Sequence, residues 1–400
     1  MFDAIHLPLS RKWGDPVTLR LLVTIRDVSA ALHLVQVVRA LKGDARFETR
    51  ILAQQPASRI LRSMEIEHVE INAPAATTDD SPEALHLLAI ARSELSAYRP
   101  DAVLAGLSTP FDGGIDEAVL AEANVPSYLL QDFWGEQNKF FGKGAGLFFA
   151  LDATAAEMNR RRFGVESVIV GSARHAAYAE YNFQDLRNVS RRDLGISGKT
   201  PVIGFFGQAL NRLPGYRRTL ITFIRAVESL GSDIQILVRM HPRETEKDVV
   251  DTLAAFASSS LKPVIANHGS VDECLAACDV VCSLFSNCTY DASYQNYYST
   301  VPISVPVSLL FDVEIAEYYR ERVSFEELPL HRHRLVLPVY RQDLVAATLA
   351  TALTEREKSQ ISIRAKTHLS DPSDACRLIL ETILACTQGG KSMAVDLGRS

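Results

Sequence analysis

The chain has no hydrophobic run long enough to cross a membrane. None of the apolar stretches in its 400 residues approaches the roughly 18 residues that a membrane-spanning helix needs. The N-terminal sequence MFDAIHLPLSRKWGDP has neither an apolar core nor a small-residue cleavage site, so it does not resemble a secretory signal. We therefore expect a cytoplasmic protein, and peripheral contact with a membrane is compatible with this sequence.

The chain also has fewer basic than acidic residues. The 42 Lys and Arg residues are outnumbered by 48 Asp and Glu residues, which gives a formal net charge of −6. Proteins that bind nucleic acid usually carry a strong basic surplus, so we do not expect nucleic acid as a partner. Hydrophobic residues make up 47% of the chain, enough apolar material to exclude widespread disorder.

Cysteine is scarce, and several cofactor motifs are missing. Four of the six cysteines cluster at Cys274, Cys278, Cys282 and Cys288, but their spacing matches no common zinc pattern. They fall in apolar stretches, where free cysteine is commonly a small buried hydrophobe. The sequence has no G-x-x-x-x-G-K-[ST] phosphate-binding loop, and no D-x-D motif that would bridge a donor to a metal. We expect neither a metal site nor a resident cofactor.

What the chain does contain is an alternation of strand-like apolar runs with helical stretches. At roughly 150 residues per domain, its length predicts two or three domains. A first series of elements runs to residue 170, and a second begins at residue 201. The predicted strands are 17–25, 47–53, 69–71, 102–106, 127–131, 146–151 and 167–170, then 201–206, 234–239, 264–266, 280–284 and 301–305. The predicted helices are 28–42, 81–96, 114–124 and 153–162, then 217–230, 244–256, 271–277 and 291–298.

Strands that alternate with helices form parallel sheets from right-handed βαβ units. Two such series predict an α/β protein with two doubly wound Rossmann-like domains. The polar, charged segment between the series predicts a helix followed by a linker. The expected division is a first domain at 1–173, the linker at 174–199, a second domain at 200–371 and a C-terminal segment at 372–400. Because ligands of open α/β sheets bind outside the carboxyl ends of the strands, the domains should face each other across a cleft.

The loop after the predicted strand 234–239 contains a histidine between two arginines. His241 follows the strand end, with Arg239 before it and Arg243 after it. A histidine in this position can donate to a phosphate oxygen, and the arginines add complementary charge. The alternative is a histidine that only caps its own loop.

Two further strand-end loops of the second series are rich in hydrogen-bond donors. Ser286, Asn287 and Thr289 precede a predicted helix, where such residues are good N-caps. A helix N-terminus also offers free N–H groups to a phosphate, so both roles are open. The other loop contains Gly207, Gln208 and Arg212, which suit either a phosphate contact or a simple turn. The histidines His331 and His333 lie in a predicted loop, where we expect them to be solvated.

At these residues the sequence resembles a known family. The stretch SVDECLAACDVVCSLFSNCTYDASYQNYYSTVPISV resembles the nucleotide pocket of glycosyltransferases with the GT-B fold. The segment ILVRMHPRE resembles the His-Pro motif of bacterial sialyl-, polysialyl- and Kdo-transferases, which use CMP-activated sugars. CDP-glycerol polymerases and UDP-N-acetylglucosamine 2-epimerases have similar segments. The resemblance covers most of the chain in architecture, and it is specific in residues only around 239–243 and 283–290.

The resemblance implies a role for each part of the chain. The second domain would bind the nucleotide sugar and the first domain the acceptor, while the helix near Asp374–Ala385 would cross back to the first domain ahead of a loose tail. His241, Ser286 and Asn287 would contact the donor phosphate. One departure is that the paired acids before glycine of bacterial sialyltransferases are missing, and Asp112-Gly113-Gly114 supplies only one acid.

The first series should supply the catalytic base. An inverting transfer needs a carboxylate to take the proton of the acceptor hydroxyl. Three aspartates at strand ends are candidates, in the order Asp112, Asp132 and Asp27. Asp112 lies in a glycine-flanked loop, Asp132 precedes two aromatic residues that could stack on a sugar, and Asp27 is most simply a helix N-cap.

Together these features predict a metal-independent glycosyltransferase. It would move a sugar from a nucleotide-sugar donor to a glycan or protein acceptor, in the assembly of bacterial surface polysaccharide or flagellar glycan. A CMP-activated acid sugar is the favoured donor, and a UDP-sugar is next. The alternatives are a UDP-sugar 2-epimerase and a catalytically inactive nucleotide-binding scaffold of the same fold.

Overall fold

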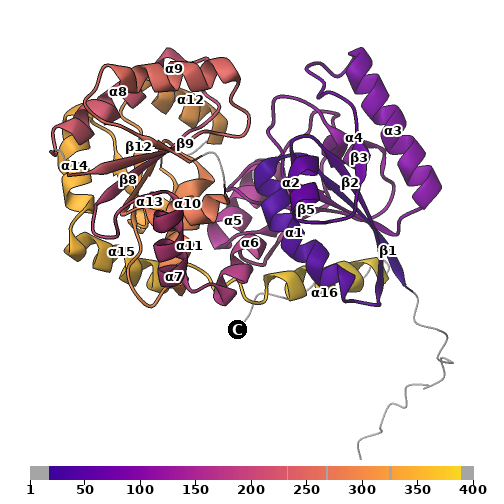
Figure 1. Ribbon diagram of the computed structural model, residues 1–400. Helices are drawn as coiled ribbons and strands as arrows, with labels where there is room; N and C mark the ends of the chain where they lie inside the picture. The colour runs from indigo at the N-terminus through magenta and orange to yellow at the C-terminus, as the bar shows by residue number, and fades with distance from the viewer. Residues whose placement is uncertain (1–17, 232, 267–268, 324–326, 389–400) are drawn as a thin grey trace, which may run out of the picture.

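The computed structural model of the protein describes residues 18–231, 233–266, 269–323 and 327–388 (Figure 1). These residues form two domains, each built on one parallel sheet with helices on both faces. The predicted class, an α/β protein with two doubly wound domains, is thereby confirmed. The tail expected at the C-terminus lies mostly outside the described residues.

The first sheet has seven strands in the order β3-β2-β1-β4-β5-β6-β7, and every neighbouring pair is parallel. Its strands are β1 (Leu19–Ile25), β2 (Phe47–Gln54), β3 (Val69–Ile71), β4 (Ala102–Gly106), β5 (Ser127–Leu130), β6 (Leu147–Ala150) and β7 (Ser167–Ile169). The helices that connect them are α1 (Val28–Lys42), α2 (Ala57–Ser63), α3 (Pro82–Tyr98), α4 (Ile115–Glu122) and α5 (Ala153–Phe163).

The second sheet has six parallel strands in the order β10-β9-β8-β11-β12-β13. Its strands are β8 (Val202–Phe206), β9 (Gln235–Arg239), β10 (Val264–Ile265), β11 (Val280–Ser283), β12 (Val305–Leu309) and β13 (Leu337–Val339). Its helices are α8 (Pro214–Glu228), α9 (Glu246–Ala257), α10 (Val271–Ala277), α11 (Asn287–Tyr298), α12 (Val313–Val323), α13 (Pro329–Arg332), the 3-10 helix η2 (Gln342–Leu344), α14 (Val345–Ala352) and α15 (Glu355–His368).

The central strands are buried on both faces, which explains their nearly continuous apolar sequences. Along β1, Leu21 and Val23 belong to the core cluster on the α1 side of the sheet. Leu22 belongs to the cluster on the opposite side, with residues of α3 and α4. Side chains alternate between the faces of a strand, so a strand covered on both sides is apolar at most positions.

Two elements begin four residues from their predicted starts. The predicted strand 301–305 is wrong, because β12 begins at Val305 and continues through Pro306, which pairs with Val281 of β11. Proline lacks an N–H, yet Pro306 lies within β12, which pairs with β11 on one side and β13 on the other. Helix α11 begins at Asn287 instead of residue 291, since Ser286 caps it.

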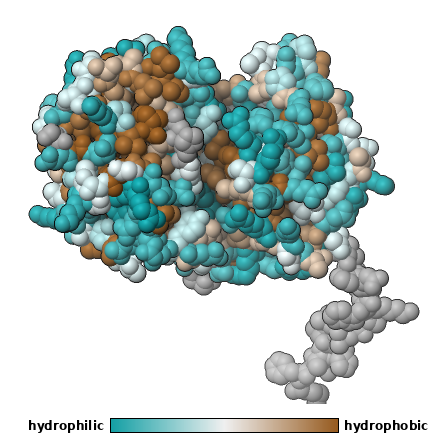
Figure 2. All heavy atoms as spheres, in the orientation of Figure 1, coloured by the Kyte–Doolittle hydropathy of each residue, from teal (hydrophilic) through white to brown (hydrophobic). Residues whose placement is uncertain are grey.

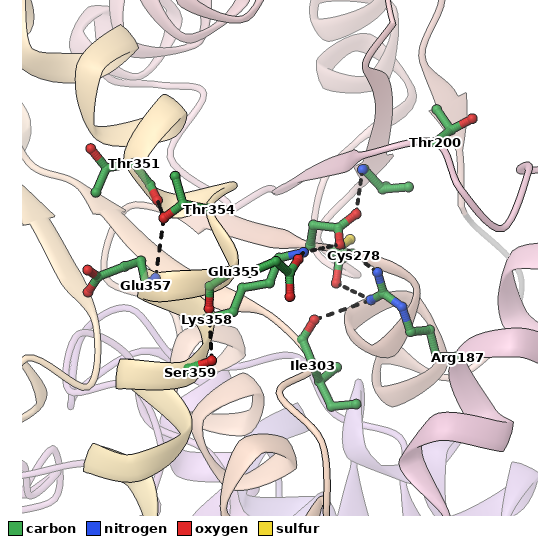
Figure 3. Close-up of polar contacts among 12 residues, drawn as sticks. Arg187, Thr200, Cys278, Ile303, Thr351, Thr354, Glu355, Glu357, Lys358 and Ser359 are labelled. Atoms are coloured by element: carbon green, nitrogen blue, oxygen red, sulfur yellow. Dashed lines mark hydrogen bonds and ion pairs between the residues drawn. The ribbon is translucent and has the colours of Figure 1, made fainter.

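The segment expected to hold a linker is largely helical. It contains α6 (Ala173–Ala176), the 3-10 helix η1 (Ala177–Glu180) and α7 (Phe183–Asp193). Arg187 and Arg191 of α7 and Lys358 of α15 all reach the carboxylate of Asp279, at 2.7, 2.7 and 2.8 Å. The Asp279 carboxylate also accepts the N–H of Val202. These contacts, which Figure 3 shows around Arg187 and Lys358, fasten α7 and α15 to the amino ends of β8 and β11.

The last helix, α16 (Ala375–Gln388), packs against the first domain. Ile379 and Ile383 of α16 belong to the same buried cluster as Leu34 and Val38 of α1. In Figure 1 the yellow α16 lies beside the indigo α1, at the other end of the colour scale. The C-terminal end of the chain therefore completes the core of the domain with which the chain began.

Some residues considered for chemistry are parts of the core. Cys278 and Cys282 are buried, and burial raises the pKa of both thiols. Among the described residues, no group of His, Cys, Asp and Glu could hold a metal ion. His331 was expected to be solvated but is buried in α13, beside the Tyr340 hydroxyl, and burial lowers its pKa to about 4. Within the described ranges, no helix has the length and apolar character of a membrane span.

Candidate active site

A cleft of about 850 Å³ lies between the two domains, and Figure 2 shows a hollow between the two halves of the molecule. It is lined by loops at the carboxyl ends of β1, β4 and β5 on one side and of β8, β9 and β11 on the other. Strand order reverses between β1 and β4 and between β8 and β11, where ligands of such sheets bind. Lining residues include Asp27, Ser29, Thr109, Asp112, Asp132 and Glu136, and, from the second domain, Gln208, Arg212, His241, Arg243, Ser286, Asn287 and Tyr318.

His241 lines the cleft from the loop after β9. Its Nδ1 atom accepts a hydrogen bond of 3.1 Å from the backbone N–H of Arg243. Burial, together with the charge of Arg243, lowers the pKa of His241 to about 4. The ring is therefore neutral at pH 7. Because Nδ1 is an acceptor, the single ring proton is on Nε2, which makes this atom a hydrogen-bond donor.

Two arginines add positive charge to the same wall. Arg243 donates from Nη1 to the Thr109 hydroxyl across the cleft, at 3.3 Å. Arg212 donates to the Tyr318 hydroxyl at 2.8 Å, and its Cζ lies 5.5 Å from the centre of the Tyr318 ring. Arg212 and Arg243, which the sequence assigned to the donor site, thus both line the cleft.

The N-terminus of α11 also faces the cleft. Ser286 is the N-cap, and its hydroxyl accepts the N–H of Cys288 at 3.2 Å. Thr289 was expected in the donor site, but it is buried and donates to the carbonyl oxygen of Ser286 at 2.9 Å. The helix starts four residues earlier than predicted, and this places Thr289 inside its first turn.

Asn287, next to the cap, reaches the other domain. Its amide nitrogen donates to the Ser29 hydroxyl at 2.8 Å and to the backbone carbonyl of Asp132 at 3.2 Å. A carbonyl oxygen can only accept, so the amide orientation is settled by this contact. The loop that the sequence linked to phosphate binding is therefore in direct contact with a candidate base.

Arg239 does not reach the cleft. Its guanidinium donates to the carbonyl oxygens of Ala266 and Gly269, at 2.9 and 3.0 Å. Arg239 therefore holds the segment between β10 and α10. The Arg239 side chain, which the sequence assigned to the donor site, is thus engaged outside the cleft lining.

Gly207 and Gln208 have separate roles in the loop after β8. Gly207 does not line the cleft, since a Cβ atom there would lie 3.1 Å from the Tyr216 hydroxyl and 3.2 Å from the Glu244 carboxylate. The absence of a side chain at Gly207 thus suits the close packing of this loop. Gln208 does line the cleft, and its Oε1 accepts the N–H of Phe285 at 3.0 Å. This bond ties together the loops after β8 and β11.

Asp112 is engaged by an arginine. Its carboxylate accepts a bond of 2.6 Å from Arg26, while its side chain is 38% exposed. Arg26 is buried, and Glu117 is its second acidic neighbour at 3.6 Å. Burial works to lower the pKa of Arg26, but the surrounding carboxylates outweigh it and keep the pKa high. Asp112 is thus bound to a cation and open to solvent, so the first-ranked candidate fits the role of base poorly.

Asp27 occupies the N-cap position of α1 but does not cap it with its side chain. Its carboxylate instead accepts the N–H and the hydroxyl of Thr109, at 2.9 and 2.7 Å. The expected capping role is therefore wrong. Asp27 ties the loop after β1 to the loop after β4, 82 residues further along the chain.

Asp132 has the environment of a general base. Only 5% of the residue is exposed. Burial raises its pKa to about 7, and the charge of Asp27 adds to this, while a hydrogen bond from Ser29 opposes it. A carboxylate that titrates near neutral pH is suited to accept a proton during catalysis.

The two walls of the cleft carry opposite charge. Asp27, Asp112, Asp132 and Glu136 line the first-domain side. The described lining of the second domain contains arginines and no acidic residue. An anionic group will therefore bind against the second domain, and positive charge or proton donors will be favoured at the first.

Several site residues were absent from the sequence interpretation. They are Arg26, Ser29, Thr109, Glu136 and Tyr318. Four of them lie within four residues of a predicted aspartate, so the position just after a strand was a usable signal. Tyr318 comes from α12, far from any motif, and no local pattern marked it.

The chain matches no protein-family model and no curated protein in sequence. Solved structures do match it. The UDP-GlcNAc 2-epimerase of Neisseria meningitidis, bound to UDP-GlcNAc, superposes with a TM-score of 0.67 at 12% identity, over 92% of this chain and 100% of that one. The UDP co-structure of S. aureus MnaA gives 0.68 at 13%, over 95% and 100%.

A third similar structure is MurG of Acinetobacter baumannii, with a TM-score of 0.55 at 11% identity, over 91% of this chain and 99% of that one. The chain has the GT-B fold. Both halves of the molecule and the cleft between them are included in these superpositions, because coverage exceeds nine-tenths of the chain in each case. The architecture that the resemblance implied is confirmed.

Proposed function

We propose that the protein is a glycosyltransferase whose donor is a neutral sugar on a nucleoside diphosphate, and whose general base is Asp132. The observation that carries this proposal is the complementary chemistry of the two cleft walls. A neutral histidine donor, an arginine and a helix N-terminus lie on one side, and a buried carboxylate with a pKa of about 7 lies on the other.

The second-domain wall would hold the diphosphate. The Nε2–H of His241 would donate to a phosphate oxygen, and Arg243 would offset its charge. The N-terminus of α11 adds free N–H groups and the positive end of the helix dipole. These groups would stabilise the negative charge that builds on the diphosphate as the sugar–oxygen bond breaks.

Asp132 would act from the opposite wall. The acceptor hydroxyl attacks the anomeric carbon, its proton passes to the Asp132 carboxylate, and the bonding electrons leave with the diphosphate. Asp132 suits this step better than Asp112, whose carboxylate is bound to Arg26 at 2.6 Å and is open to solvent. The proposal therefore reverses the order of the first two candidates.

The charge of the first-domain wall also bears on the donor. The sequence favoured a CMP-activated acid sugar, but a sugar carboxylate would meet Asp27, Asp132 and Glu136 at close quarters. A neutral sugar avoids this repulsion, and a diphosphate makes fuller use of the positive wall. The similar structures with UDP-GlcNAc and UDP bound are consistent with a UDP-sugar.

A UDP-sugar 2-epimerase is the second candidate. It is supported by the epimerase superpositions, whose TM-scores of 0.67 and 0.68 exceed the 0.55 of MurG. Epimerisation removes the proton from C2 of the sugar while the nucleoside diphosphate leaves. A proton is then returned to C2 and the nucleoside diphosphate is bonded to the sugar again. The several carboxylates of the first-domain wall could supply the acid and the base that this needs.

Incubation of the protein with UDP-GlcNAc, UDP-glucose and a CMP-activated acid sugar, with and without glycan acceptors, would test the proposal. We expect slow release of UDP without acceptor, faster release with the right acceptor, and no change at C2 by NMR. Inversion at C2 would establish the epimerase instead. Tighter binding of the CMP-sugar would refute the donor assignment. Binding of UDP without turnover of any donor would leave the protein a nucleotide-binding scaffold.

A further inference from the structure

A cavity of about 430 Å³ lies at the end of the second-domain sheet opposite to the cleft. Its walls include Pro201, Asp279 and residues 301–303, which precede β8, β11 and β12. Helices α7 and α15 form much of the remainder. None of its described lining residues lines the cleft. The volume is within the range of small-molecule sites, roughly 300–1,000 Å³, and we call this space the basal cavity.

Basic side chains from three segments line the basal cavity. They are Arg187 and Arg191 of α7, Lys199 of the loop before β8, and Lys358 of α15. The acidic residues of the described lining are Asp279 and Glu355. The four positive charges therefore exceed the two negative charges by two, and this excess attracts an anion.

Three of these cations retain hydrogen-bond donors that the described part of the chain does not use. An ammonium group has three donors, and that of Lys358 bonds Asp279 at 2.8 Å and Glu355 at 3.0 Å. Arg187 donates from Nη1 and Nη2, which leaves its Nε–H without an acceptor among the described residues. Lys199 is exposed, and no described residue accepts a hydrogen bond from its ammonium group. Figure 3 shows the Arg187 and Lys358 side chains extending toward each other from α7 and α15.

We propose that the basal cavity is a second ligand site, which binds a phosphate group. A phosphate monoester has three terminal oxygens and a charge of about −1.5 to −2 at pH 7, which matches the excess of positive charge. The unused donors of Lys199, Arg187 and Lys358 come from three segments and suit three oxygens. A carboxylate has one charge and two oxygens, so it would leave part of this lining uncompensated. The inference does not rest on the proposed function, because the two cavities share no described lining residue.

The position of the basal cavity links it to both chain crossings between the domains. The chain enters the second domain through α7 and leaves it through α15, ahead of α16 in the first domain. Arg187 and Lys358 are already joined through the Asp279 carboxylate, at 2.7 and 2.8 Å. A phosphate bound between them adds a second bridge from α7 to α15. Binding should therefore raise the melting temperature, because only the folded state contains this site.

The test is calorimetric titration with inorganic phosphate, glucose 6-phosphate and succinate, a dicarboxylate of the same charge. The His241→Ala variant is used throughout, so that phosphate binding in the cleft is weakened. We expect both phosphate probes to bind and succinate to bind about tenfold more weakly. Tighter binding of glucose 6-phosphate than of inorganic phosphate would identify a phosphorylated small molecule as the ligand, and the reverse order would identify the free ion. Absence of binding by both phosphate probes, or equal affinity for succinate, would overturn the proposal.

Charge variants locate the site. Lys358→Gln should weaken binding of the better phosphate probe by roughly tenfold or more, because a charge-assisted hydrogen bond is lost. Lys199→Glu should weaken it by roughly three- to tenfold, since it reverses a charge that solvent screens, and Lys199→Arg should preserve it. Lys262→Glu, at an exposed lysine outside both cavities, is the matched control and should leave the affinity unchanged. Unchanged affinity in folded Lys358→Gln and Lys199→Glu variants would place the phosphate elsewhere and refute this site.

Discussion

Asp132→Asn should lower activity and raise stability, and the gain in stability should depend on pH. The folded protein raises the pKa of Asp132 from 3.8 to about 7. Below pH 4 the carboxyl is protonated in both the folded and the unfolded state, and its ionisation does not affect stability. As the pH rises from 4 to 7, the unfolded state loses this proton first, so the free energy of unfolding decreases. A difference of about three pH units corresponds to about 4 kcal/mol of unfolding free energy.

Asparagine is neutral at every pH, so the variant avoids this loss. The difference in unfolding free energy, variant minus wild type, should grow by up to about 4 kcal/mol between pH 4 and pH 8. Turnover should fall by about 10²- to 10⁴-fold, since a general base is removed. In the wild type, kcat/KM should rise with pH and level off above about 7, where the base is ionised.

The assay is urea unfolding of both proteins at pH 4.5, 6 and 8, together with turnover of the best donor. Asp80→Asn, at an exposed position outside the cleft, is the matched control and should change neither quantity. A stability difference that stays flat across this range would refute the raised pKa. Full turnover in Asp132→Asn would place the base elsewhere, even if the stability difference follows the expected course.

Three further outcomes follow from the structure. His241→Ala should weaken UDP binding by roughly ten- to a hundred-fold in calorimetry, because one hydrogen bond to a charged group is lost; unchanged affinity would remove the phosphate from this loop. Asp112→Asn should lower the melting temperature, since the buried Arg26 loses its 2.6 Å partner, yet should keep most of the turnover; a loss as large as that in Asp132→Asn would restore Asp112 as the base. Asp279→Asn should cost about 3–5 kcal/mol of stability, because Arg187 and its neighbours would lose their shared carboxylate; an unchanged urea midpoint would show that this ion-pair cluster is not stabilising.

The order of elements along this chain was readable from sequence because it depends on local patterns. Apolar runs of strand length alternate with helical faces, and that alternation permits few arrangements other than parallel, doubly wound sheets. The same rule located much of the site. His241, Asn287, Asp27 and Asp132 each follow a strand, and the carboxyl ends of parallel strands meet at one edge of a sheet.

What only the tertiary structure decided is which strands are neighbours and which side chains meet. The order that places β1 beside β4 and β8 beside β11 has no local signature, yet it brings Asp27 to Thr109 across 82 residues. The pairing of Arg26 with Asp112, and the burial of Asp132, changed the assignment of the base. A carboxylate's basicity depends on the charges and solvent around it, and these come from segments distant in the chain. The sequence could therefore identify the acidic residues that are candidates for the base. Only their surroundings in the folded protein could rank these candidates.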